Sequence, residues 1–167
     1  MKAVKLLSVL FLGIFLTSTA HAKDLKIAYV ELGGVFNNYQ KTKEFDASLQ
    51  KESQDVQNQL DNMIKKIRDD QGKLALLKED EKEKLQASIQ KQVDSLNELR
   101  NQKRIELSKK FDDMKKQIII EIEKVVSDIA KKDGYTYIFN DTVLLYGEQE
   151  SNVTEKVLAT LNAGYKK

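Results

Sequence analysis

From about residue 41 to residue 132, apolar side chains recur at alternating steps of three and four. In the first half of this stretch they are Leu49, Val56, Leu60, Met63, Ile67, Leu74 and Leu77. Two polar residues, Ser53 and Asp70, interrupt the row. This spacing is typical of an amphipathic helix with a narrow apolar seam. Helix is further favoured because the chain has no proline and Gly72 is the only glycine in the stretch.

A second apolar row follows in the same stretch, at Leu85, Ile89, Val93, Leu96 and Leu99. One unbroken helix would extend on the order of 140 Å and leave its seam uncovered. We therefore predict an antiparallel helical hairpin over residues 41–117, an arm in which each row covers the other. The dense run of charge at residues 77–82 is the predicted tip of this arm.

The segment after the arm has a different pattern. Residues 118–126 are apolar almost all round, which predicts a helix buried on most sides. Gly134 is placed to end that helix. Alternating residues then predict strands at 135–139 and 143–146, and Thr154 can cap a last short helix.

The two ends of the chain are expected to form one small body from residues 23–40 and 118–167. Residues 26–32 predict a strand, and Gly33-Gly34 a turn into a brief helix. The fold class is α+β, mostly α, with a long hairpin on a body of three short strands. A sheet this small has open edges, which favours self-association. The residues expected to build this oligomerisation body are Ile27, Tyr29, Tyr137, Phe139, Val143 and Leu145.

The first 22 residues have the order of features of a secretory signal. Lys2 and Lys5 precede an apolar run at 6–16, and Ala20-His21-Ala22 supplies the small residues read at cleavage. The apolar run is too short to span a membrane comfortably. We predict a signal peptide at residues 1–22 and a mature chain that is soluble outside the cytoplasm.

Loss of the signal changes the chemistry that remains. Lys2 and Lys5 leave, so the 28 basic side chains become 26 and balance the 26 acidic ones. A nucleic-acid binder normally has a clear basic excess, so that class is disfavoured. His21 leaves too and the chain has no cysteine, which removes the commonest general base and metal ligands. We expect neither an enzyme nor a cofactor, and Gly33-Gly34 matches no phosphate-binding loop.

Three segments carry a resemblance to a known family. They are residues 26–39, residues 134–146 and residues 153–162. In these segments the chain resembles the Skp/OmpH family of periplasmic chaperones. The resemblance implies a homotrimer with a small barrel-like body and three hairpins around a cavity. It also implies that unfolded outer-membrane proteins are held in that cavity without ATP. The family's best-known members are strongly basic, so the balanced charge here weighs against contact of the arm tip with membrane or lipopolysaccharide.

Not every apolar residue of the arm fits a narrow seam. The candidates for client contact are Met63, Ile64, Leu74 and Leu76; the alternative is that they pack the two helices together. Gly72 near the tip is expected to loosen the outer arm. The second helix also has a basic excess, which is either a solvated face or a weakly attractive inner wall. These residues are Arg100, Lys103, Arg104, Lys109, Lys110, Lys115 and Lys116. The competing functional class is a coiled-coil spacer or tether in the cell envelope.

Overall fold

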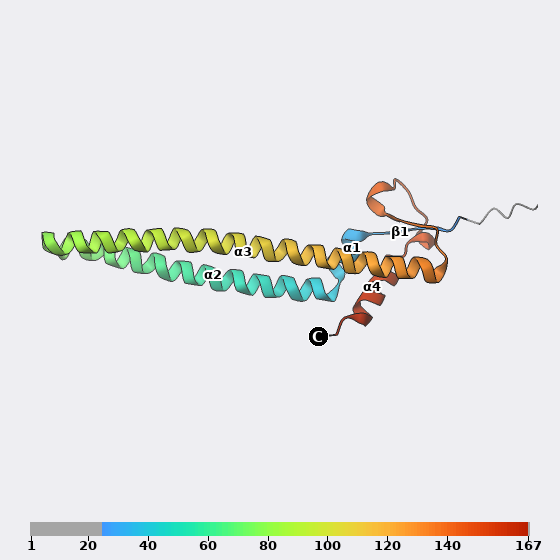
Figure 1. Cartoon of the computed structure of the whole chain (residues 1–167), viewed down its shortest axis with the longest axis horizontal. Coiled ribbons are helices and arrows are strands. Elements are labelled where there is room, and N and C mark those ends of the chain that lie inside the picture. Colours follow the sequence, from blue (N-terminus) through green and yellow to red (C-terminus); the bar gives the residue numbers. More distant parts are fainter. Residues whose placement is uncertain (1–24, 167) are drawn as a thin grey trace, which may run out of the picture.

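A long helical hairpin projects from a small body, as predicted (Figure 1). The computed structural model describes residues 25–166, so the predicted signal peptide lies outside the described residues. Helix α2 runs from Gln40 to Lys73 and helix α3 from Glu79 to Asp133. They lie side by side along the arm, and α3 continues past the start of α2 into the body.

The turn of the hairpin lies before the charged run that was predicted to form it. Helix α2 ends at Lys73, a 3-10 turn (η1) spans Leu74–Leu76, and α3 begins at Glu79. The first turn of α3 is acidic, at Glu79, Asp80 and Glu81. Carboxylates stabilise the positive N-terminal end of a helix, so this run starts α3 instead of breaking the chain. The predicted tip at 77–82 is therefore corrected to about 74–78.

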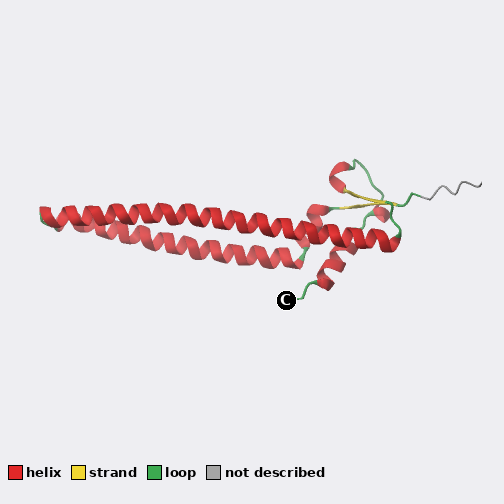
Figure 2. Ribbon diagram, in the orientation of Figure 1, coloured by secondary structure: helices red, strands yellow, loops and turns green. Residues whose placement is uncertain are grey.

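Two short parallel strands from opposite ends of the chain form the sheet (Figure 2). Strand β1, Ile27–Val30, pairs with β2, Tyr137–Asn140, with Ile27 opposite Tyr137. Helix α1, Leu32–Asn38, follows β1 directly, and α4 runs from Thr154 to Gly164. Both strand predictions are confirmed in type, although each strand is shorter than its predicted range.

The core of the body lies where α3 meets these elements. Ile118 and Ile122 on α3 are fully buried, in agreement with the apolar pattern of this segment. Ile120, two residues before Ile122, is 54% exposed, so the prediction that this part of the helix is buried on most sides is wrong: one side faces the core and another faces solvent. The buried members of the core cluster are Ala28, Val30, Val35, Tyr39, Ile118, Ile122, Ile129, Val153, Val157 and Leu161.

The predicted third strand does not form in the single chain. Asp141–Val143 is a 3-10 turn (η2), and residues 144–148 pair with no strand within residues 25–166. The free side of β1 is already occupied, because the Val153 N–H donates to the Tyr29 carbonyl at 2.9 Å. A strand exists only where a neighbour supplies its hydrogen bonds; the 3-10 turn follows β2 directly, and within the described residues 143–146 does not return along the outer edge of β2. The prediction of three strands is therefore wrong for the isolated chain.

Two local predictions about helix starts are also wrong. Gly33 and Gly34 lie inside α1 and do not form a turn before it. Thr154 does not cap α4 with its side chain; its Oγ1 instead accepts a hydrogen bond from the Glu31 N–H at 2.8 Å. This bond ties the start of α4 to the end of β1. The predicted helix end at Gly134 is confirmed, because Gly134 adopts the left-handed conformation with φ 75°.

The C-terminal helix fastens the base of the arm to the body. The chain is extended at Tyr39, between α1 and α2, where the arm begins. Asn162 on α4 accepts a hydrogen bond from the Gln40 N–H at 2.9 Å, so it caps α2 from another element. The Tyr165 ring packs edge-on against the Tyr39 ring, with centroids 5.8 Å apart. The Tyr165 hydroxyl also hydrogen-bonds Glu44 at 3.3 Å.

Stability is expected to fall between about pH 10 and pH 12 through Tyr39. Burial, and after it the negative charge of Glu121, whose carboxylate lies 3.1 Å from the hydroxyl, together raise the pKa of the Tyr39 phenol to about 12. An unfolded tyrosine loses its proton near pH 10, whereas the folded chain keeps this one to about pH 12. The stabilisation is complete below pH 10 and is lost across this interval. Thermal melts at pH 9, 10 and 11 measure it. Tyr39→Phe should show a smaller loss than the natural chain, and equal losses would contradict the assignment.

Candidate binding surfaces of the arm and the body

The seam between α2 and α3 is closed by an apolar cluster along the outer arm. Its buried members are Leu60, Ile67, Ile89 and Leu96, and its partly buried members are Val56, Met63, Ile64, Leu74, Leu85, Val93 and Leu99. Three of the four predicted client-contact residues, Met63, Ile64 and Leu74, are thus half-buried beside this seam. Only Leu76, in the turn, is presented to solvent, with 86% of its surface exposed. Client contact by these four residues stays a prediction.

The polar interruption of the seam is bridged across the hairpin. Asp70 accepts hydrogen bonds from Lys73 Nζ at 2.7 Å and from Gln92 Nε2 on α3 at 3.0 Å. The bond from Lys73, and then the bond from Gln92, hold the pKa of Asp70 below its usual value. The seam therefore has a polar link at the position where the sequence indicated only an interruption. Gly72 is exposed, and a methyl group added there would meet nothing within 4 Å.

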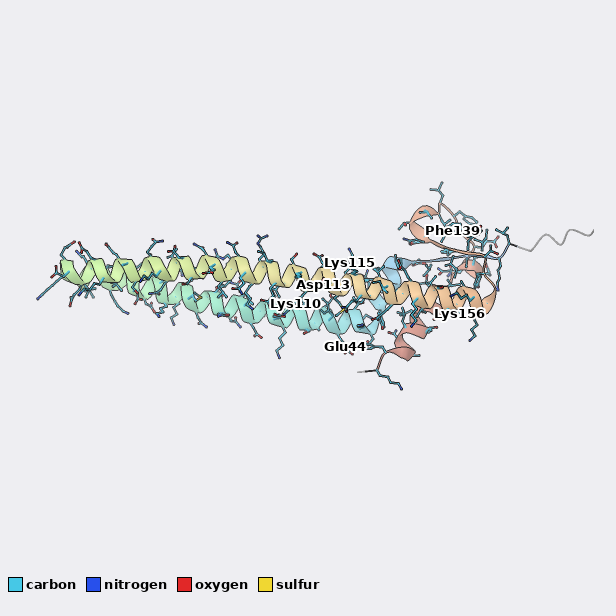
Figure 3. The ribbon with its side chains drawn as sticks, viewed as in Figure 1. Glu44, Lys110, Asp113, Lys115, Phe139 and Lys156 are labelled. Atoms are coloured by element: carbon cyan, nitrogen blue, oxygen red, sulfur yellow. The ribbon has the colours of Figure 1, made fainter. Side chains whose placement is uncertain are left out.

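The seven residues of the predicted basic excess on α3 divide into two groups. Lys103 and Lys110 both contact Glu106, at 2.7 and 3.3 Å, and Lys110 crosses the seam to Glu52 at 2.5 Å. Lys109 pairs with Asp113 at 2.6 Å. Among residues 25–166, the other four form no ion pair within 4.0 Å; they are Arg100, Arg104, Lys115 and Lys116. Figure 3 shows Lys110 towards α2 and Lys115 on another side of α3.

Exposed apolar side chains gather on the body around the sheet and the loop after it. We call this surface the body patch; its members are Ile27, Tyr137, Phe139, Val143, Leu145 and Tyr146, all exposed. Phe139 marks its place on the body in Figure 3. The rings of Tyr137 and Phe139 stack at 5.9 Å. Exposed apolar side chains in such number on a small body are typical of an interaction surface.

Five of the six residues predicted for the oligomerisation body belong to the body patch, and Tyr29 lies half-buried at its edge. A shallow groove of about 390 Å³ at this edge is lined by Tyr29, Phe139 and Tyr146 among others. The loop passes close to Tyr29 at Gly147, where an added Cβ would lie 2.6 Å from the ring. Tyr146 is not among the residues predicted from the sequence, because its exposure depends on the path of this loop. A role of these residues in oligomerisation stays a prediction.

The described part of the chain contains neither a metal-binding cluster nor a membrane-spanning helix. No group of three or more His, Cys, Asp or Glu side chains within residues 25–166 is arranged to hold a metal ion. Over the same residues, no helix is both long enough and apolar enough to span a membrane.

Comparison with known proteins places this architecture in a family. Residues 26–161 match the family model described as outer membrane protein (OmpH-like). The chaperone protein Skp of Vibrio cholerae is 26% identical over 168 aligned positions, which cover 96% of each chain. An OmpH-like protein of Caulobacter crescentus has the same fold, with a TM-score of 0.80 at 14% identity. That alignment covers 86% of this chain and 87% of the other.

Proposed function

This chain belongs to the OmpH-like family of outer membrane proteins, and we propose that it is an ATP-independent holdase chaperone of the periplasm. In this proposal residues 1–22 direct secretion and are removed. The mature chain assembles into a homotrimer through the body patch. It binds unfolded outer-membrane proteins between its arms and prevents their aggregation before they reach the outer membrane. It catalyses no reaction and needs no cofactor.

The observation that carries the proposal is the exposed hairpin on a small body. The two helices of the arm cover each other only along a narrow seam, and their remaining surface carries mobile lysine, glutamine and glutamate side chains. Long side chains with apolar stems and polar ends adapt to varied partners through many weak contacts. Such a surface suits unfolded clients, which offer no fixed shape to recognise.

Self-association is supported by the state of the sheet. Two parallel strands of four residues each are too few to be stable alone, and the outer edge of β2 has no neighbour within the described chain. The body patch lies beside that edge and exposes apolar surface that a monomer would leave in water. A second and third copy of the chain would cover both the outer edge of β2 and the body patch.

The test is light scattering on size-separated mature protein, alone and after dilution of a urea-unfolded outer-membrane barrel protein into it. We expect a trimer that gains the mass of one client and keeps the client soluble without ATP. The same client in its folded form, as the control, should not bind. If the oligomer forms but the client precipitates as it does alone, the chain is a spacer or tether with a dedicated partner.

A further inference from the structure

One side of α3 near the body presents cations around an exposed aromatic ring. We call this side the open flank; it consists of Arg100, Arg104, Phe111 and Lys115. Relative to Arg100, the other three follow at steps of 4, 11 and 15 residues. At 3.6 residues per turn these positions fall within about 60° of each other, so they form one row along the helix. No acidic residue belongs to this row.

The open flank differs from the paired lysines of the same helix. Lys103, Lys109 and Lys110 are held in ion pairs with carboxylates. The three cations of the open flank form no ion pair within residues 25–166, and Phe111 is 40% exposed. A row of unneutralised cations with a ring between them can bind a ligand without first breaking an internal contact.

The net charge of this part of the arm is positive, and the positive excess lies on α3. Residues 100–120 hold seven basic and three acidic side chains, whereas the facing stretch of α2, residues 40–61, holds three and five. Together they have an excess of two positive charges. The mature chain as a whole is neutral, so positive charge is concentrated at the base of the arm. Charge complementarity therefore favours an acidic partner here.

The spacing of the open flank fits an extended polypeptide. Fifteen residues of helix rise about 22 Å, which an extended chain covers with six or seven residues. A four-residue step, from Arg100 to Arg104 or from Phe111 to Lys115, rises about 6 Å. Side chains on the same face of an extended chain are about 6.6 Å apart. Two successive same-face side chains of a bound segment can thus meet either pair, and the seven-residue step between the pairs rises about 10 Å.

We propose that the open flank captures short extended segments of an unfolded chain that carry carboxylates and an aromatic or aliphatic side chain on the same face. Arg100, Arg104 and Lys115 contact the carboxylates, and Phe111 contacts the apolar side chain. This inference rests on the proposed holdase function and names the part of a client that binds first. The contacts are exposed and screened by salt, which makes capture fast and reversible.

The test uses the mature full-length chain and two fluorescent peptide probes. Both probes place three charged residues and one aromatic residue on one face of an extended chain; one carries glutamates and the other carries lysines at the same positions. The natural chain should bind the acidic probe more tightly, and 0.5 M salt should abolish the preference. In a triple variant, Arg100→Gln, Arg104→Gln and Lys115→Gln, affinity for the acidic probe should fall at least about fivefold. Phe111→Ala should weaken binding of both probes.

A matched control makes the same change in net charge at another place on the arm. Lys65→Gln, Lys66→Gln and Lys91→Gln remove three exposed, unpaired lysines from the outer arm. The inference is overturned if this control loses as much affinity as the triple variant, or if the triple variant binds the acidic probe as the natural chain does. Failure of the natural chain to keep any unfolded protein soluble would instead overturn the holdase function itself.

Discussion

Ile122→Ala is expected to lower the free energy of unfolding of the body by about 2–5 kcal/mol, the range for truncating a fully buried aliphatic side chain. Ile122 has no exposed surface and lies in the core cluster beside Val35 and Val157, which come from α1 and α4. Its truncation leaves a cavity where elements from both ends of the chain meet. The body is small, so it has little other buried apolar surface to offset the loss.

Urea unfolding followed by tyrosine fluorescence measures this effect, because all six tyrosines lie in the body segments and the chain has no tryptophan. Protein concentration must be equal in all samples, since association contributes to stability. Ile120→Ala is the matched control: the same substitution, two residues away on the same helix, at a side chain that is 54% exposed. It should cost well under 1 kcal/mol. Equal losses for the two variants would show that α3 does not enter the body with the observed orientation.

The double substitution Val143→Glu and Leu145→Glu is expected to convert the assembly to monomers. In the single chain these side chains are 69% and 108% exposed, so their replacement removes almost no packing within the chain. In the proposed trimer they are covered by another copy, where a buried carboxylate without a partner is strongly unfavourable. Asp141, Glu148 and Glu150 in the same segment would add repulsion.

Light scattering on size-separated protein gives the mass of each variant, and circular dichroism verifies that the helices persist. Leu76→Glu is the control, because it places a glutamate on a leucine that is also exposed, at the far end of the arm. Its mass should equal that of the natural chain. If the body-patch variant also keeps its full mass, the self-association surface lies elsewhere and the proposed trimer geometry is wrong.

Much of the arm was predictable because its helices depend on local patterns. Positions Leu60, Ile67, Ile89 and Leu96 were placed in two facing apolar rows from spacing alone, and they are the buried centre of the seam. A repeat with a period near 3.5 has one apolar side, and a hairpin is the simplest way for one chain to cover it. The end of α3 at Gly134 was predictable for a similar reason, since a left-handed residue after a helix favours glycine.

The division of α3 into an ion-paired side and the open flank could not be predicted. The sequence showed seven basic residues in a helix but not which carboxylates each would reach. Lys110 contacts Glu52, which is 58 positions away, only because the hairpin brings them together. Asp70 interrupts the apolar row in the sequence, and only the hairpin brings it next to Gln92 on the opposite helix, which donates a hydrogen bond to it.

The sequence by itself determined the hairpin, the ends of its helices to within a few residues, the two strands and the family. These follow from periodicity, from glycine and charge at helix ends, and from short motifs, all of which act over a few neighbouring residues. Only the tertiary structure decided that 143–146 is not a strand, that Thr154 bonds Glu31, and which face of α3 stays open. The first two depend on contacts between residues more than 120 positions apart, and the third depends in part on the contact of Lys110 with Glu52 across 58 positions. No local pattern specifies which distant group will occupy a given edge or side chain.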